Sequence, residues 1–405
     1  MTDSRKRLHI AMVCDPISNV KSGSVISSIR FAQLLQKQGH HIIFIGARTR
    51  EHRDHNNHDG IKVYRYRGTS YPKSGGYYLA FPTVQELKKV FQKEKIDIVH
   101  IILPMSGALV AMRAARLLGI KVVTHSHSQP ENLFIDMPKF IRPILHDLWN
   151  KYLRWLYGKT EYVIYPSEIA RDLLHLNKKN QPSAVISNGI NLKEFKPTDI
   201  GNFYKRFNIP GNTVKLLFVG RLYPEKSVDT LIKAVPYIVE KQENIHIMIV
   251  GAGHLRQKLE KLVKDLRVQK YVTFLGLISD KDKVLAYNAC DIFVLPSLAE
   301  LEGMVVLEAM ACAKPIVIAN TEMSAARYFV QGNGFLFKAL DYKDLAAQAL
   351  KLITDDELRK KFGQVSLKNI EAYDINRSVE LLENVYYSVL GIDKSNQTIH
   401  YSHKL

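Results

Sequence analysis

Residues 42–45 read Ile-Ile-Phe-Ile, and this short run decides the fold class. A strand with one face in water alternates apolar and polar side chains, whereas all four side chains here are apolar. Such a strand is buried on both faces, as in parallel sheets that helices cover on either side. Residues 25–38 predict a helix that Gly39 ends, so a helix leads directly into this buried strand.

The same alternation extends outward from this run through the N-terminal half. Further strands are predicted at residues 8–13, 60–64, 96–101, 120–124, 162–164 and 184–186, and further helices at residues 84–94 and 108–118. Helices between buried strands are typical of an α/β protein with a doubly wound, Rossmann-like parallel sheet.

The pattern starts again after residue 213, which predicts a second α/β domain. Its strands are expected at residues 215–219, 245–250, 272–275, 292–295 and 315–318. The polar stretch 191–213, which contains Pro and Gly, is interpreted as a linker. The expected organisation is a domain at 1–190, this linker, a second domain at 214–374, a helix at 375–391 that crosses back to the first domain, and a tail at 392–405.

Length and composition agree with a large globular protein. A chain of 405 residues exceeds a single compact core. Hydrophobic content of 46% and charged content of 24% exclude general disorder. The net charge of +18 predicts attraction to nucleic acid, anionic lipid or a phosphorylated substrate. Because the basic residues are dispersed and form no recognised nucleic-acid-binding module, no nucleic acid partner is expected.

The cysteines and the N-terminus favour a cytoplasmic protein. Cys14, Cys290 and Cys312 lack the spacing of metal ligands and are expected to stay reduced. No apolar run approaches the roughly 20 residues that a spanning helix needs. Asp15 and Pro16 interrupt the first apolar stretch, so it does not read as a signal peptide.

Residues 296–315, PSLAELEGMVVLEAMACAKP, contain the strongest candidate ligand site. Glu308 falls within an apolar run, where an ionised carboxylate is costly without a specific polar partner. We expect a ligand to be that partner. The alternative is an amphipathic helix in which Glu300 and Glu308 are incidental.

A phosphate site is predicted between these two glutamates. Gly303 lies in a turn just ahead of a predicted helix, which frees the N–H groups of the first helical residues. The helix dipole and these unpaired donors favour an anion such as phosphate. The residues concerned are Met304, Val305 and Val306. Carboxylates on either side could accept bonds from ribose or sugar hydroxyls, so the segment suits a nucleotide sugar.

These residues resemble a known enzyme family. Glu300 and Glu308, separated by seven residues, resemble the E-x7-E signature of the family 4 retaining glycosyltransferases of the GT-B fold, in which two Rossmann-like domains face each other across a cleft. Gly220 and Arg221, followed by Lys226, match the family's G-R-x4-K pattern at the end of a predicted strand. Arg221 and Lys226 can neutralise a diphosphate. The resemblance covers roughly residues 8–390.

Three weaker motifs lie in the same half. Gly251 and Gly253 resemble the family's G-x-G, although a simple tight turn explains them equally well. Residues 188–191, NGIN, resemble the hinge motif that precedes the family's linker, with Asn191 in place of the usual aspartate. Residues 332–335, GNGF, resemble a late turn common in the family.

Two features of the N-terminal half complete the expected site. Gly23 opens the first helix, where the backbone can approach a phosphate, and the resemblance implies that it faces the donor; a plain helix-entry glycine is the alternative. His127 and Glu131 resemble the histidine and glutamate of lipid-modifying members, which implies that His127 lies near the reacting centre. A metal at His125 and His127 would need a third ligand, and none has convincing spacing, so no metal site and no required cofactor are predicted.

Residues 137–157 indicate the acceptor. Leu145, Leu148, Trp149, Tyr152 and Leu156 recur at helical spacing, and Asp147, Asn150, Lys151 and Arg154 share the opposite face. A basic amphipathic helix can lie on an anionic membrane surface. A helix that packs its apolar face into the core is the alternative. Residues 300–303, ELEG, also resemble the E-x-Q-G of members that glycosylate diacylglycerol, with Glu302 in place of glutamine.

The sequence therefore predicts a retaining, nucleotide-sugar-dependent hexosyltransferase at the inner face of the cell membrane. UDP-glucose is the favoured donor, and a lipid such as diacylglycerol is the expected acceptor. The expected catalytic residues are His127, Arg221, Lys226 and Glu300, with Glu300 in an electrostatic role. The alternatives are the same chemistry on a soluble or polysaccharide acceptor, a sugar-nucleotide epimerase of the same fold, or a nucleic-acid-binding protein.

Overall fold

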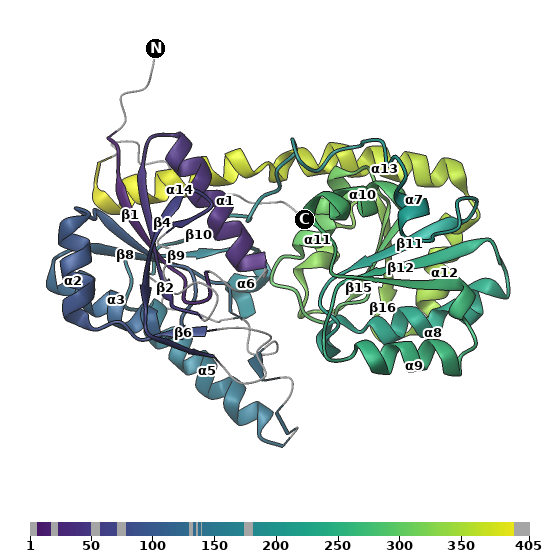
Figure 1. Ribbon diagram of the computed structural model, residues 1–405, viewed down its shortest axis with the longest axis horizontal. Coiled ribbons are helices and arrows are strands. Elements are labelled where there is room, and N and C mark those ends of the chain that lie inside the picture. Colours follow the sequence, from purple (N-terminus) through teal and green to yellow (C-terminus); the bar gives the residue numbers. More distant parts are fainter. Residues whose placement is uncertain are drawn as a thin grey trace, which may run out of the picture. The chain divides into compact units, whose positions relative to one another are not determined.

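The computed structural model describes residues 6–17, 23–49, 57–70, 78–128, 133–134, 137–138, 140–173 and 181–392. The chain divides into two compact units, Met1–Asn188 with Asn376–Leu405, and Gly189–Ile375 (Figure 1). Each unit is built on its own sheet, so the alternation seen in the sequence belongs to two separate α/β layers.

The first unit is built on a mostly parallel sheet. Among the described residues its strand order is β10-β9-β8-β7-β1-β2-β4-β3, and β3 and β4 form its antiparallel pair. A separate hairpin joins β5 and β6. The bounds are β1 His9–Val13, β2 His41–Ala47, β3 Asn57–His58, β4 Ile61–Tyr66, β5 Gly68–Ser70, β6 Tyr78–Ala80, β7 Ile98–Ile101, β8 Lys121–His125, β9 Tyr162–Tyr165 and β10 Ser183–Val185.

Helices connect these strands, as parallel pairing requires. Their bounds are α1 Gly23–Lys37, α2 Val84–Lys93, α3 Ser106–Leu117, α5 Arg142–Tyr157 and α6 Glu168–Leu173. The helix α2 begins where Thr83 and Glu86 form a reciprocal capping box, which satisfies N–H groups that would otherwise lack acceptors.

The C-terminal helix α14, Ile375–Leu390, belongs to the first unit from residue 376 onward. Side-chain hydrogen bonds hold it there, and two of them involve histidines. Nε2 of His40 lies 2.8 Å from Oε1 of Glu383, and Nδ1 of His100 lies 2.7 Å from the hydroxyl of Tyr386. Because Nδ1 of His40 accepts from the N–H of Leu8, its Nε2 carries the proton and donates to the carboxylate.

The second unit has a fully parallel sheet with the order β13-β12-β11-β14-β15-β16 among the described residues. Its strands are β11 Val214–Val219, β12 Ile245–Val250, β13 Val272–Gly276, β14 Ile292–Leu295, β15 Ile316–Asn320 and β16 Gly334–Lys338. Its α-helices are α7 Phe203–Arg206, α8 Val228–Val239, α9 Arg256–Asp265, α10 Asp280–Ala289, α11 Met304–Ala311, α12 Tyr342–Ile353 and α13 Asp356–Ile370. Short 3₁₀ turns are η1 Pro224–Lys226, η2 Gln269–Tyr271, η3 Ala325–Phe329 and η4 Glu371–Tyr373.

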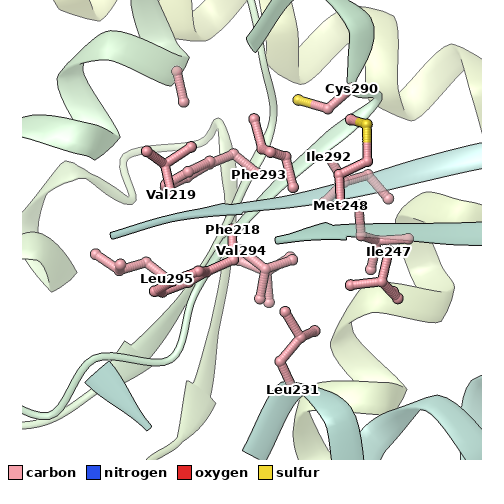
Figure 2. Packing of buried hydrophobic residues seen from close by; sticks show 14 of the residues in the cluster. Phe218, Val219, Leu231, Ile247, Met248, Cys290, Ile292, Phe293, Val294 and Leu295 are labelled. Carbon is pink, nitrogen blue, oxygen red and sulfur yellow. The ribbon is translucent and has the colours of Figure 1, made fainter. Parts of the chain in front are cut away.

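The core of the second unit lies between its central strands and the helices that cover them. Phe218 of β11, Met248 of β12, Phe293 of β14 and Leu231 of α8 belong to this core. In Figure 2 Met248 and Phe293 lie on one side of the central strands and Leu231 lies on the other, so apolar side chains cover both faces of the sheet. All four side chains are fully buried, and each such burial contributes about 1.5–3 kcal/mol relative to an exposed side chain. This rigid layer fixes the strand ends from which the site residues project.

The predicted strands of both units are present, with ends that differ by one or two residues. The stretch 191–213, expected to be a linker, lies inside the second unit, where Phe195 and Phe203 are fully buried. Its polar composition hid these two isolated aromatic anchors. Residues 332–335 were expected to form a turn. Instead, Gly334 and Phe335 are the first two residues of the edge strand β16.

Each sheet reverses its strand order at one point. In the first sheet β1 lies between β7 and β2, and in the second sheet β11 lies between β12 and β14. Ligands of doubly wound sheets bind beyond the carboxyl ends of the strands at such a point. These strand ends carry Asp15 after β1, Gly220 after β11 and the loop to Glu300 after β14.

Candidate active site

The loop after β11 presents an oriented arginine. Arg221 donates from Nη2 to Oε1 of Glu225 at 3.0 Å, and its guanidinium lies 4.8 Å from the ring centroid of Tyr223. The side chain of Arg221 is 41% exposed, whereas that of Glu225 is buried. The buried carboxylate and the aromatic ring therefore hold the guanidinium at the strand end while it stays open to an anion.

Lys226 and Glu300, predicted from separate motifs, form an ion pair. Nζ of Lys226 donates to Oε1 of Glu300 at 2.6 Å, and the two side chains are only 12% and 14% exposed. The backbone supports this pair, because the N–H of Leu298 donates to the carbonyl of Glu225 at 2.7 Å. The structure thus brings together the cation and the carboxylate that the two motifs supply.

The helix α11 begins beside this pair. Gly303 has a φ of 97°, a left-handed conformation that costs glycine little, and it caps the helix without a side chain. The N–H of Val306, which was expected to be free for a phosphate, instead donates to the carbonyl of Gly303 at 2.8 Å, so this part of the prediction is wrong. The N–H groups of Met304 and Val305 lie in the first turn, which has no acceptors within the helix. Together with the dipole they form the expected phosphate-binding end.

The carboxylate of Glu308 forms hydrogen bonds with other side chains of the protein. This differs from the prediction, in which a ligand was its hydrogen-bond partner. Oε1 accepts from Nζ of Lys283 at 2.9 Å, and Oε2 accepts from the hydroxyl of Tyr287 at 2.7 Å. Burial, together with the charge of Glu308, raises the pKa of Tyr287 well above its usual value. Both partners lie four residues apart on α10, so helical spacing was the available signal that sequence reasoning missed.

The glycines after β12 have a structural reason. A Cβ on Gly251 would lie 1.8 Å from the carbonyl oxygen of Gly220, and one on Gly253 would lie 2.3 Å from that of Leu222. Gly251 also has a φ of 134°. The two strand-end loops therefore pack backbone against backbone, which explains the G-x-G pattern without a ligand.

In the first unit, Gly23 and His127 lie where the sequence placed them. Gly23 is the first residue of α1 and is exposed. His127 lies two residues after the end of β8, and burial lowers its pKa to about 3, so the ring is neutral at neutral pH. Glu131, expected to accompany His127, lies outside the described residues.

Asp15 is a buried carboxylate that the sequence analysis noted only because it interrupts the first apolar stretch. Its Oδ2 accepts from the N–H of Ala80 at 2.9 Å, from that of Gly107 at 3.2 Å, and from the hydroxyl of Ser106 at 3.1 Å. It therefore caps the start of α3. Burial raises the pKa of Asp15 to about 6, against the opposing effect of these hydrogen bonds.

This raised pKa predicts a pH dependence of stability. Because the folded state binds the Asp15 proton more tightly than the unfolded state, the stability it contributes is full below about pH 4 and is lost as pH rises through about 6. Relative to Asp15→Asn, the wild-type free energy of unfolding should fall by roughly 3 kcal/mol over this range. Urea unfolding of both proteins at pH 4 to 7 measures this difference. A difference that is constant or grows with pH would refute the assignment.

Two family models match the chain. The model for Glycosyltransferase Family 4 matches residues 21–194, and the model for Glycosyl transferases group 1 matches residues 199–368. Fold and matches together define a glycosyltransferase with the GT-B fold, as the sequence predicted. The chain belongs to glycosyltransferase family 4.

Individual relatives are similar at a moderate level. The chain is 26% identical to the N-acetyl-alpha-D-glucosaminyl L-malate synthase of Bacillus anthracis over 402 residues, 96% of this chain and 100% of that protein. It is 27% identical to the alpha-monoglucosyldiacylglycerol synthase of Streptococcus pneumoniae over 302 residues, 72% of this chain and 67% of that protein. Sucrose-phosphate synthase from Thermosynechococcus elongatus has a TM-score of 0.80 at 19% identity, covering 96% of this chain and 100% of that structure, and shows the fold alone.

Two further findings concern the described residues only. They contain no group of three or more His, Cys, Asp or Glu side chains that could hold a metal ion. Within that same part of the chain, every helix is too short or too polar to cross a membrane.

Proposed function

We propose that this glycosyltransferase moves a hexose, with UDP-glucose as the favoured donor, to a hydroxyl of a membrane lipid such as diacylglycerol, with retention of the α configuration. The Lys226–Glu300 pair beside the start of α11 carries the donor half of this proposal. A cation, two first-turn N–H groups and a carboxylate meet at the strand ends where a doubly wound sheet binds nucleotides.

Each residue has a distinct role in this proposal. Lys226, Arg221 and the N-terminus of α11 neutralise the diphosphate as it leaves. Glu300 contacts the sugar and stabilises the positive charge that develops on its ring. Glu308 binds the ribose hydroxyls, because a carboxylate has about four acceptor positions and the protein uses two of them. The neutral ring of His127 bonds a hydroxyl near the reacting centre.

The lipid acceptor in this proposal is inferred from α5. The buried and exposed faces of this helix are not the ones that the sequence predicted. Trp149 donates to the hydroxyl of Ser128 at 3.2 Å, Tyr152 donates to the carbonyl of Pro104 at 2.9 Å, and Leu156 is fully buried. The face expected to meet a membrane therefore packs mostly onto its own unit. An apolar row that shares only Leu148 with the expected face is exposed. This row, the α5 stripe, consists of Phe140 just before the helix and of Ile144, Leu148 and Trp155 within it, and these side chains are 50% to 80% exposed.

Cations accompany the α5 stripe. Lys151 is 63% exposed and lies between Leu148 and Trp155 in the same helical row. Nζ of Lys159 lies 5.1 Å from the ring centroid of Trp155. Exposed apolar side chains with adjacent lysines suit an anionic lipid surface, where the apolar groups enter the interface and the ammonium groups meet headgroups. We therefore propose that the enzyme binds the inner face of the cell membrane through this stripe.

The stripe predicts separable effects on vesicle binding. Ile144→Ser with Leu148→Ser should lower binding to anionic vesicles at every salt concentration, because apolar burial is not screened. Lys151→Glu with Lys159→Glu should remove the salt-sensitive part, at about 1 kcal/mol per charge. Vesicle sedimentation across a salt series measures both effects.

Two variants control this experiment. Leu277→Ser removes an exposed leucine of the second unit and should leave vesicle binding unchanged. Trp149→Ala should lower the melting temperature, because Trp149 packs against the first unit. If the α5 stripe variants sediment with vesicles like the wild type, the proposed binding to the membrane through this stripe is refuted.

A soluble acceptor is the second candidate. The relative that aligns over its whole length is named for a product that contains L-malate, a small soluble acid. The same donor site would serve either acceptor. A panel of acceptors, with diacylglycerol in vesicles and malate or polysaccharides in solution, separates the two: transfer confined to soluble acceptors would replace the lipid assignment.

A further inference from the structure

Three histidine rings form a stack in the first unit. The ring centroid of His127 lies 4.1 Å from that of His125, with 18° between the planes. The ring of His125 lies 5.7 Å from that of His100 on β7, with 10° between the planes. The order inward from the end of β8 is therefore His127, His125 and His100, and Phe31 of α1 adds a further parallel ring 6.1 Å from His125.

The inner end of the stack is anchored. Nδ1 of His100 lies 2.7 Å from the hydroxyl of Tyr386 on α14, and both residues are fully buried. Burial lowers the pKa of His100 to about 3 and holds the pKa of His125 well below its usual value. All three rings are therefore neutral at neutral pH, so they stack without charge repulsion.

The buried position of His125 is unfavourable for the stability of the fold. It is fully buried, and neither ring nitrogen has a hydrogen-bond partner in the described part of the chain. A buried polar group without a partner destabilises a fold, and an apolar side chain would avoid that penalty. Such a group in a native core requires an explanation, and functional sites are where this kind of local conflict is expected.

We propose that His125 is a positioning residue for His127: as a flat ring held between His127 and His100, it fixes the plane of the His127 ring at the end of β8. This inference rests on the proposed function, in which His127 bonds a hydroxyl. The geometry supplies the reason. His127 is the outermost ring and follows the strand, so the ring behind it limits its rotation.

The size of the effect follows from stacking. Alignment of two aromatic rings stabilises their contact. The aligned arrangement is therefore a few-fold to about tenfold more populated than an unaligned one. Loss of the flat ring should therefore lower kcat by up to about tenfold. The donor KM should stay within about twofold, because the donor groups lie in the other unit.

Two substitutions test the proposal. His125→Leu keeps a similar volume but removes the flat ring, and His125→Phe keeps a flat ring without polar atoms. We expect His125→Leu to lower kcat by a few-fold to about tenfold and His125→Phe to retain most of the wild-type kcat. Neither should lower the melting temperature much, because both remove the unpartnered nitrogens. His246→Leu is the control, since His246 is also buried, has one unpartnered nitrogen, and lies at the amino end of β12.

A second readout does not depend on activity. The ring of His125 shifts the NMR signals of the His127 ring protons, and this shift should be lost in His125→Leu and kept in His125→Phe. An unchanged shift and wild-type kcat in His125→Leu would overturn the proposal, as would equal loss of kcat in both variants. Absence of transfer from every nucleotide sugar in the wild type would instead refute the proposed function, while the NMR comparison would still decide the positioning role.

Discussion

Lys226→Ala should lower kcat by about 10²-fold or more. Lys226 forms the 2.6 Å ion pair with Glu300, and both side chains are shielded from water. Its charge therefore acts on the leaving diphosphate with little screening. Steady-state kinetics with saturating donor, beside thermal melting, measure the loss.

The control for this change is Lys233→Ala. Lys233 pairs with Asp229 at 2.7 Å in the same unit, but on an exposed helix surface, where such pairs contribute little. It should retain wild-type kcat. A folded Lys226→Ala enzyme with near wild-type transfer would remove the central assignment of the donor site.

Glu300→Gln should also lower kcat by about 10²-fold, with donor binding changed much less. The amide keeps the shape and can still accept from Lys226, but it lacks the charge that stabilises a positive sugar ring in the transition state. Kinetics and donor titration on this variant separate turnover from binding.

Glu308→Gln should behave differently. It should weaken donor binding and lower the melting temperature. The carboxylate of Glu308 accepts hydrogen bonds from both Lys283 and Tyr287, whereas the glutamine must turn its NH₂ group towards one of these two donors. If Glu300→Gln weakened the donor and left kcat unchanged while Glu308→Gln did the reverse, the two roles would be interchanged.

The fold could be predicted because its signals are local. Apolar runs such as Ile42 to Ile45 read directly as doubly buried strands, and glycines such as Gly39 mark helix ends. Lys226 and Glu300 were identifiable because each belongs to a short motif at a strand end. Their ion pair was not predicted, because it joins loops 74 positions apart in the chain.

What the sequence missed depends on tertiary packing. Lys283 and Tyr287 satisfy Glu308 from α10. Their spacing places them on one face of that helix, but it does not show that this face contacts α11. In α5, both faces carry large apolar residues, so periodicity could not show that Trp149 packs inward while Trp155 is exposed. The stretch 191–213 reads as polar, and scattered apolar residues such as Phe195, Phe203 and Ile209 tie it to the core.

The proposed reaction can be tested by supplying UDP-glucose and diacylglycerol in anionic vesicles to the wild-type protein and identifying the lipid product and its anomeric configuration by NMR. We expect an α-linked glucosyl lipid and one UDP released for each sugar transferred. UDP release without a glycolipid, or a β-linked product, would contradict the proposed reaction.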